Sequence, residues 1–425
     1  MDRLANTVRP YAWGSVTAIP ELLGTEPTGE PQAELWMGAH PGAPSRIARP
    51  TRGAHGTPAA RDAAGAVDRP TDSDPQALRP LRPLSDVIAA DPEGELGPAA
   101  VKKFGPRLPF LFKVLAAGAP LSLQVHPNLA QAQEGYADEE RRGVPVDAPD
   151  RNYKDANHKP ELICALTGFN GLCGFRVPAE SADLLDALAV DSLKPYADLL
   201  RAHPEEAALR EVLTAVLTAD PADMAATVTA TAHAAARLAA DPATAPTEAA
   251  AYAAYAGLAH HFPGDPGVLA AMLLNHVRLQ PGEALFLGAG VPHAYLDGLG
   301  VEIMANSDNV LRCGLTPKHV DVPELLRVVR FEATDPGVLR PEAAPDGEEL
   351  YDTPIDEFRL SRYVLAADAA PARLPAGAPQ ILLCTAGSPR AGDLPLAPGE
   401  SVFVPADEKT ELSGPGTVFR ATIAV

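Results

Sequence analysis

Short apolar segments bounded by turn residues characterise the first half of the chain and predict β-strands. Leu108–Leu115 is a short, continuous apolar run, which is typical of a buried strand. In residues 120–127 apolar and polar side chains alternate. One face of this predicted strand is therefore apolar, and the other carries Ser122, Gln124 and His126.

Other parts of the first half predict little regular structure. Residues 1–45 are turn-rich. Residues 46–75 contain almost no large apolar side chain, so they cannot bury enough surface to offset their ordering entropy, and a long or disordered surface loop is expected. Residues 134–156 form a polar, acidic insert before another strand candidate, Glu161–Leu166.

The pattern becomes helical between residues 178 and 276. Apolar residues between Leu209 and Leu217 recur at i, i+3, i+4, i+7 and i+8, and Pro204 is suited to a first helical position. Asp-Pro pairs separate the alanine-rich segments that follow. We therefore expect an α-helical insert between β segments.

The β pattern returns at residue 276 and continues to the C-terminus. Within it Pro281–Gly290 resembles Pro398–Asp407. Each segment combines a Pro-Gly turn, an alternating strand and a second turn, which predicts two related β-barrel modules. His293 follows the first segment, but no histidine occurs after His319, so the second module is expected to be structural.

Composition and charge narrow the possible functions. A chain of 425 residues is expected to form two or three domains. Its formal net charge of −20 argues against nucleic acid as a partner, and an anionic substrate would need a local cluster of Arg and Lys. The four separated cysteines are expected to be buried thiols. Without a signal-peptide core or an apolar segment of about 18 residues, a cytoplasmic protein that does not contact a membrane is expected.

Four motifs carry residues suited to metal or acid–base chemistry, and each has a simpler interpretation alone. Gln124 and His126 share a strand face and can converge on one ion, although such polar pairs more often face solvent. Glu161 opens an apolar strand, where a carboxylate needs a metal or a base such as Lys159. A turn presents His293 at the mouth of a strand, where a structural histidine is the simpler interpretation.

The fourth motif is the polar segment Val301–Lys318. It contains Glu302, Arg312 and Lys318 within a short stretch. Taken alone, this segment would be interpreted as a solvated charged loop.

Together, these segments resemble the signatures of one family, the type I mannose-6-phosphate isomerases (phosphomannose isomerases). The matching segments are Pro120–Asn128, Asn157–Glu161, Gly290–Tyr295 and Ser307–Lys318. The resemblance runs from about residue 11 to about residue 324, with weaker patterning beyond. It implies a zinc-dependent enzyme that interconverts mannose 6-phosphate and fructose 6-phosphate. The departures, residues 46–75 and the skewed helical composition, do not touch the motifs.

The resemblance also implies roles for individual residues. It implies one zinc ion per chain, with the ligands Gln124, His126, Glu161 and His293. The catalytic arginine of the family falls on Arg312. Its other polar pocket residues fall on Ser122, Lys159, Glu302 and Lys318. Because three of the four ligands are neutral, the zinc would keep a net positive charge and could act as a Lewis acid.

The implied reaction moves a proton between C1 and C2 of the sugar through an enediol. It needs a polarised carbonyl, a base that serves both carbons and stabilisation of the oxyanion. We expect zinc to orient the substrate and support the enediolate, and Arg312 to close over it. Lys318 and Ser122 are expected to hold the phosphate, and Glu302 and Lys159 are both candidates for the base.

The predicted fold is mainly β with a helical insert: a cupin-like double β-barrel (jelly-roll) plus a helical domain. The predicted domains are a catalytic cupin-like domain (1–177 with 277–335), a helical insert (178–276) and a C-terminal cupin-like domain without a metal site (336–425). The expected partner is a small sugar phosphate, and the chain is expected to be a monomer.

Two other functions remain open from the sequence. An iron oxygenase on a cupin fold would more naturally have a His-rich site with open positions for O₂, and the predicted Gln ligand and basic pocket argue against it. A sugar-phosphate sensor without activity would not need Arg312, Lys159 and Glu302, all of which are present. Metal analysis and a coupled assay with mannose 6-phosphate would separate these functions.

Overall fold

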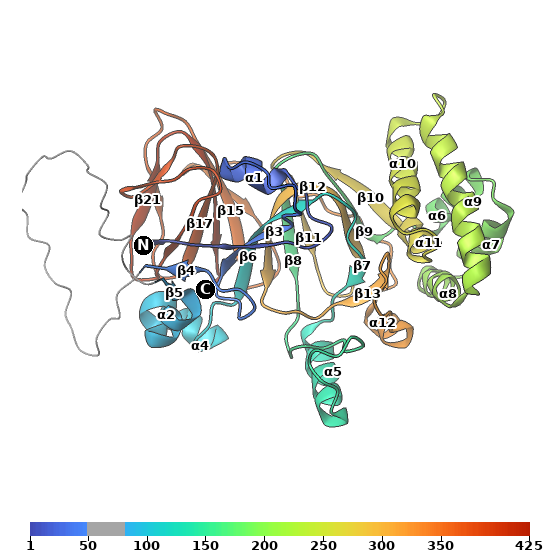
Figure 1. The fold of residues 1–425 in the computed structure, drawn as a ribbon, viewed down its shortest axis with the longest axis horizontal. Coiled ribbons are helices and arrows are strands. Elements are labelled where there is room, and N and C mark those ends of the chain that lie inside the picture. Colours follow the sequence, from blue (N-terminus) through green and yellow to red (C-terminus); the bar gives the residue numbers. More distant parts are fainter. Residues whose placement is uncertain (49–80) are drawn as a thin grey trace, which may run out of the picture.

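The computed structural model describes residues 1–48 and 81–425 (Figure 1). The surface loop predicted for residues 46–75 falls largely on residues outside this description. Within the described part, two large antiparallel sheets lie side by side, and a group of helices packs at the far end of the first sheet (Figure 1). The prediction of a mainly β protein with a helical insert is thereby confirmed.

The first large sheet contains all four predicted motifs or borders them. Its main path runs β10–β9–β12–β6–β3–β2, and four further strands pair with it through β12 or through one another. The strands are β2 (Thr7–Arg9), β3 (Glu34–Gly38), β6 (Phe110–Ala117), β7 (Leu123–Val125), β8 (Glu161–Ala165), β9 (Phe169–Phe175), β10 (Leu274–Leu279), β11 (Ala284–Leu287), β12 (His293–Ala305) and β13 (Leu311–Gly314).

Strand β12 connects the two halves of this sheet. Its first residues pair with β7 and β9, and its last residues pair with β6 and β8. As a result, β12 brings the β7 motif and the β8 motif to opposite edges of one long strand. The predicted strands at 108–115 and 161–166 are present as β6 and β8, and every residue of both is buried.

The second large sheet has the order β1–β20–β17–β22–β15–β14, and a four-stranded sheet, β16–β21–β18–β19, packs against it. The large-sheet strands are β1 (Asp2–Arg3), β14 (Glu348–Tyr351), β15 (Arg359–Leu365), β17 (Gln380–Gly387), β20 (Ser401–Val404) and β22 (Gly416–Thr422). The smaller sheet consists of β16 (Ala372–Leu374), β18 (Arg390–Ala391), β19 (Leu394–Pro395) and β21 (Thr410–Ser413). A shared apolar core, including Phe112 and Phe403, joins the two large sheets.

The helical insert follows the predicted pattern. It comprises α6 (Pro178–Ala187), a 3₁₀ turn (Asp191–Leu193), α7 (Lys194–Ala202), α8 (Glu205–Thr218), α9 (Pro221–Ala240), α10 (Pro246–His261) and α11 (Gly267–Met272). Pro204 occupies the cap position immediately before α8 rather than the first helical position. The apolar stripe of α8 packs in one core with Val125 and Leu311, so the insert rests on β7 and β13.

Two elements depart from the predictions for the first half of the chain. Strand β3 is fully buried inside the supposedly turn-rich N-terminal part, because it lies between β2 and β6. Helix α5 (Leu129–Arg142) occupies the first part of the supposed acidic insert. Its start has a capping box, in which Asn128 and Gln131 exchange side-chain and backbone hydrogen bonds, and the Asn-x-x-Gln spacing is the sequence signal for this helix.

The remaining elements are short. They are α1 (Ala18–Leu23), α2 (Leu84–Ala90), α3 (Pro92–Leu96), α4 (Pro98–Phe104), α12 (Val322–Val328) and the strand pair β4 (Arg46–Ile47) and β5 (Arg82–Pro83). Among the helices described here, none has the length and apolar character needed to cross a membrane.

Candidate active site

Three adjacent strands align three of the predicted site residues. Gln124 of β7 lies opposite His293 of β12 on one side and opposite Arg312 of β13 on the other. Directly opposite residues of antiparallel strands project from the same face of a sheet. The side-chain amide of Gln124 is accordingly 3.5 Å from His293 Nε2. A half-turn of this amide exchanges its oxygen and nitrogen, so the oxygen can also face this point.

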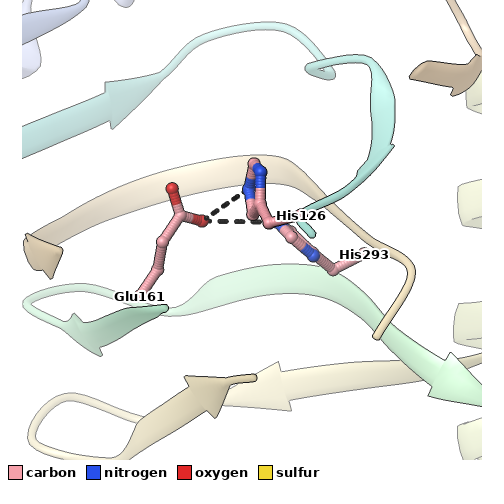
Figure 2. A group of neighbouring side chains, drawn as sticks. All are labelled: His126, Glu161 and His293. Carbon is pink, nitrogen blue, oxygen red and sulfur yellow. Dashed lines mark ion pairs between the residues drawn. The ribbon is translucent and has the colours of Figure 1, made fainter. Parts of the chain in front are cut away.

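His126, Glu161 and His293 converge on one buried point (Figure 2). Glu161 Oε2 lies 3.4 Å from His126 Nε2 and 3.3 Å from His293 Nε2. Ligand atoms that surround a tetrahedral zinc ion at about 2.1 Å are separated by about 3.4 Å. The three side chains therefore have the mutual spacing that a shared metal ion requires.

The hydrogen bonds of the two histidines orient them for metal binding. His126 Nδ1 lies 2.8 Å from the carbonyl oxygen of Asn309, and His293 Nδ1 lies 3.0 Å from that of Val291. A carbonyl oxygen only accepts, so each Nδ1 carries a proton, and in the neutral imidazole each Nε2 then presents a lone pair toward Glu161.

Two acceptor atoms at this point have no hydrogen-bond partner. His126 Nε2 and Glu161 Oε2 are both buried and unpartnered among the described residues. A neutral imidazole lone pair beside a carboxylate oxygen is unfavourable unless a cation lies between them. The donor set thus fits a bound metal ion, and nitrogen, amide and carboxylate donors suit zinc.

The ionisation of these groups is consistent with this interpretation. Burial lowers the pKa of His126 to about 4, which keeps the imidazole neutral at neutral pH. Burial alone would raise the pKa of Glu161, but Lys159 and His126 outweigh that effect and hold it well below its usual value. A neutral histidine and an ionised carboxylate are the forms that bind metals.

Glu161 was expected to bind either a metal ion or a base such as Lys159, and its two carboxylate oxygens divide these two roles between them. Lys159 Nζ lies 2.9 Å from Oε1, so the ion pair considered from the sequence is present. Oε2 faces the two histidines instead. Lys159 therefore holds one side of the carboxylate and leaves the other side free for a metal.

Glu302 lies in a fully buried network next to this point. Its Oε2 is 2.6 Å from Lys113 Nζ, and its Oε1 accepts a hydrogen bond of 3.0 Å from Tyr295. Lys113 also contacts Glu34 at 3.3 Å. Burial raises the pKa of Glu302, although Lys113 opposes the shift.

The positive charge of the site comes from Arg312, Lys318 and Lys154. Burial lowers the pKa of Arg312. The pKa of Lys318 is lowered by partial burial and then by the nearby charges of Arg312 and Lys154. Within residues 1–48 and 81–425, none of these cations forms an ion pair with a carboxylate, which leaves their charge available to an anionic ligand.

Ser122 lies two residues before Gln124, at the entrance to β7, and is partly exposed. A cavity of about 400 Å³ on the Lys154 side is lined by His40, Lys154 and Asp308, among others, and by none of the four proposed metal ligands. A concave space of this size is typical of small-molecule sites.

Several residues of the site were missed from the sequence. Lys113 stands inside the apolar run of β6, and a lone charge in such a run signals a buried partner. Tyr295 is two residues from His293 on β12, which period-two spacing could have indicated. Lys154 and Asn309 carry no comparable local signal, because their roles depend on contacts between distant segments.

Comparisons with known proteins point to one family. A family model described as "Phosphomannose isomerase type I, catalytic domain" matches residues 1–62 and 69–178. The mannose-6-phosphate isomerase of Escherichia coli (strain K12) is 39% identical over 414 residues, which cover 96% of this chain and 95% of the relative. That of Salmonella typhimurium is 38% identical and covers 99% of each chain.

Solved structures show the same agreement in three dimensions. A crystal structure of a variant phosphomannose isomerase from Salmonella typhimurium is 35% identical, covers 100% of both chains and has a TM-score of 0.85. A mannose 6-phosphate isomerase structure described as zinc-bound is 35% identical with a TM-score of 0.83, over 100% of this chain and 99% of that one. The full-length likeness supports the predicted cupin-like fold.

Proposed function

This chain belongs to the family of type I phosphomannose isomerases, and on that premise we propose that it reversibly interconverts D-mannose 6-phosphate and D-fructose 6-phosphate. The observation that carries the proposal is the pair of buried, unpartnered acceptors His126 Nε2 and Glu161 Oε2, which lie beside cations without carboxylate partners among the described residues. A metal centre next to an anion site is what an isomerase of a phosphorylated sugar needs.

We assign one zinc ion per chain to Gln124, His126, Glu161 and His293. The spacing of the last three, and the two acceptors without partners, support this set. When bound, zinc supplies Lewis-acid polarisation of a substrate oxygen. All four side chains come from β7, β8 and β12 or the residues flanking them, so the sheet holds them in place.

Arg312 and Lys318 are assigned to the negative charges of the reaction. Arg312 follows Gln124 and His293 in the same cross-strand row, where neighbouring side chains stand about 5 Å apart. Its guanidinium is therefore within reach of an oxyanion on a substrate at the ligands. Lys318, with Ser122 and Lys154, holds the phosphate.

Glu302 is the better candidate for the base. Burial raises the pKa of the Glu302 carboxyl, and a carboxylate with a raised pKa can accept a proton and return it. Its two oxygens contact Lys113 and Tyr295, which hold the carboxylate in place. Lys159 Nζ lies 2.9 Å from Glu161 Oε1 and is engaged in that ion pair. We assign Lys159 to holding the ligand carboxylate.

The proposal extends to the organisation of the chain. Residues 1–177 with 277–335 form the catalytic unit, residues 178–276 the helical insert and residues 336–425 a unit without metal. The enzyme works as a monomer in the cytoplasm. All proposed metal ligands lie in the first of these units.

The test combines metal analysis with a coupled assay on mannose 6-phosphate. We expect about one zinc per chain and turnover in the unaltered protein. Arg312→Ala should retain zinc and lose turnover by roughly 10²- to 10³-fold, as for other groups that stabilise an oxyanion. Arg359→Ala, an exposed arginine of β15, is the matched control and should keep full activity.

The alternatives give different results. Iron in place of zinc would favour an oxygenase, and zinc with substrate binding but no turnover would favour a sensor. Full activity of the Arg312→Ala variant would remove this residue from the mechanism.

A further inference from the structure

Asn309 lies in the short connection between β12 and β13 and is completely buried. Its main-chain carbonyl oxygen accepts the hydrogen bond from His126 Nδ1 at 2.8 Å. The backbone of Asn309 therefore sets the orientation of one proposed zinc ligand.

The side chain of Asn309 binds a second segment of the site. Its Oδ1 accepts hydrogen bonds from the backbone N–H groups of Lys154, at 2.7 Å, and Asp155, at 3.2 Å. Its Nδ2 donates to the carbonyl oxygens of Asp155, at 2.7 Å, and Asn157, at 2.9 Å. The amide thereby uses both of its donors and both acceptor positions on one stretch of backbone.

The segment held in this way leads directly into the metal site. Four residues after Asn157 the chain reaches Glu161, and Lys159 lies between them. At its other end, the segment carries Lys154, whose charge acts on Lys318. A shift of residues 154–157 would move a proposed ligand and a proposed phosphate contact together.

Neighbouring residues add to this connection but do not replace it. Ser307 Oγ donates to the carbonyl oxygen of Asn157 at 3.1 Å, and the Asp308 N–H donates to Asp155 at 2.8 Å. In the described part of the chain, neither of these residues forms a hydrogen bond with His126, whose Nδ1 is bonded to Asn309. Among the described residues, Asn309 is the one that forms hydrogen bonds both with His126 and with the segment 154–157.

We propose that Asn309 is a positioning residue that sets His126 and the segment carrying Lys154, Lys159 and Glu161 in one fixed arrangement. This inference rests on the proposed function. It predicts that the metal affinity and the contact with the phosphate depend on the same buried amide, although this amide touches neither group.

An amide is needed at this position for a chemical reason. Alanine would remove the partner of three main-chain groups beside the buried position 309, the N–H groups of Lys154 and Asp155 and the carbonyl oxygen of Asp155. It would also remove one of the two donors to the carbonyl oxygen of Asn157. Aspartate has the same shape and can still accept from the two N–H groups. Its second oxygen, however, would face the carbonyl oxygens of Asp155 and Asn157, which are acceptors as well.

The experiment compares Asn309→Ala and Asn309→Asp with a control, Asn275→Ala. Asn275 Nδ2 shares its two N–H donors among four carbonyl oxygens, those of Cys173, Gly174, Phe175 and Thr334. Its loss therefore removes a comparable set of bonds from the same sheet without touching residues 154–157. The measurements are zinc affinity by chelator competition, KM and kcat, and hydrogen exchange at the Lys154 and Asp155 amides.

We expect both Asn309 variants to bind zinc roughly 10- to 100-fold more weakly, as for other partners that support a ligand from outside the metal shell. KM for the sugar phosphate should rise as well, because Lys154 moves with the segment. In Asn309→Ala the two amides should exchange faster, while core amides are unchanged. Asn275→Ala should retain the zinc affinity of the unaltered protein even if its thermal stability falls.

Equal zinc affinity in Asn309→Asp and Asn275→Ala would overturn the inference, as would unchanged exchange at both amides in Asn309→Ala. If Asn309→Ala does not fold, the Asp variant, which has the same shape, decides the question by its zinc affinity. A different result would refute the proposed function: an unaltered protein that binds no zinc or does not turn over mannose 6-phosphate.

Discussion

Two strand pairs, β8 with β11 in the first large sheet and β17 with β20 in the second, are built on the same turn. In the first pair Gly282 N donates to Ala165 O at 2.8 Å, and Ala165 N donates to Glu283 O at 2.9 Å. In the second pair the corresponding distances are 2.8 Å, from Gly399 to Cys384, and 3.0 Å, from Cys384 to Glu400. The sequence resemblance between the two Pro-Gly segments is thus a resemblance of backbone hydrogen bonding.

The correspondence extends across five strands. The order β11–β8–β12–β6–β3 in the first sheet matches β20–β17–β22–β15–β14 in the second. In the first sheet Glu161 lies opposite Leu287, and in the second sheet Gln380 lies opposite Val404. Glu161 and Gln380 therefore occupy equivalent positions in the two sheets. Glu302 and Arg420 are a second equivalent pair of positions. Glu302 lies opposite Ile163 in the first sheet, and Arg420 lies opposite Leu382 in the second.

The side chains at these positions behave differently. Gln380 Oε1 accepts a hydrogen bond of 2.6 Å from Arg420, and its Nε2 donates to Pro375 O at 2.8 Å. Glu161, in contrast, keeps one oxygen without a hydrogen-bond partner among the described residues. The same strand arrangement therefore holds a fully hydrogen-bonded polar side chain in the second sheet and a candidate metal centre in the first. The two positions differ in whether a buried acceptor atom is left without a hydrogen bond.

The largest expected effect comes from making the first sheet resemble the second. Glu161→Gln removes the charge of the proposed ligand set and leaves Lys159 without its ion pair. We expect the loss of kcat/KM to exceed roughly 100-fold, the upper end for residues that only support a ligand, and zinc content to fall in parallel. Metal analysis and the coupled assay measure both quantities.

The reciprocal change, Gln380→Glu, is the matched control. It places a carboxylate on the same backbone position of the second sheet, beside Arg420. Because no histidine lies in that sheet, activity and zinc content should stay at the level of the unaltered protein. If Glu161→Gln retained both zinc and activity, Glu161 would not be a required metal ligand, and the difference between the two strand pairs would not explain the metal site.

Much of this comparison could be predicted from the sequence, because it depends on local patterns. Alternation in residues 120–127 places Gln124 and His126 on one face, and the Pro-Gly segments predict related strand pairs. These local patterns do not predict which residues from distant parts of the sequence will contact each other. Lys113 stands in an apolar run, but its meaning depends on Glu302, 189 residues away.

The overlooked elements have the same cause. Strand β3 contains Glu34 and Trp36, and its burial follows only from pairing with β2 and β6. Asn309 lies in a polar segment that would be typical of a solvated loop. It is buried because residues 154–157 fold back over it, and no local periodicity reports such a contact.

The two sheets should also differ in their response to acid. Burial lowers the pKa of His126 and of His276 to about 4, and the second sheet has no histidine. Between pH 6.5 and about 4 the unfolded chain binds protons that these folded imidazoles do not. Stability of the metal-free protein is therefore full above pH 6.5, and it falls as the pH decreases toward 4.

The lowered pKa of His126 corresponds to a loss of at most about 3 kcal/mol in the free energy of unfolding as the pH falls from 6.5 to about 4. Urea denaturation of the metal-free protein at a series of pH values measures it. His276→Gln, which is outside the proposed ligand set, should flatten part of the dependence. A profile identical to that of the unaltered chain would mean that His276 does not contribute to the difference between the sheets.

The smallest effect is expected at the turn that the two strand pairs share. Gly282 and Gly399 have φ values of 90° and 81°, a region that side chains with a Cβ adopt only at a cost. Alanine at either position should therefore lower stability by about 1 to 2 kcal/mol. A Cβ at position 282 would meet the end of the Arg362 side chain, which can move aside, whereas one at position 399 would meet Leu23.

Because Leu23 packs against the core shared by the sheets, Gly399→Ala should be the more destabilising change. Thermal unfolding of the two variants measures the difference, and zinc content should be unaffected in both. Equal losses would mean that the left-handed backbone alone sets the cost and that surroundings do not distinguish the turns. A loss confined to Gly282→Ala would contradict the packing argument, since it would make Arg362, and not Leu23, the neighbour that cannot move aside.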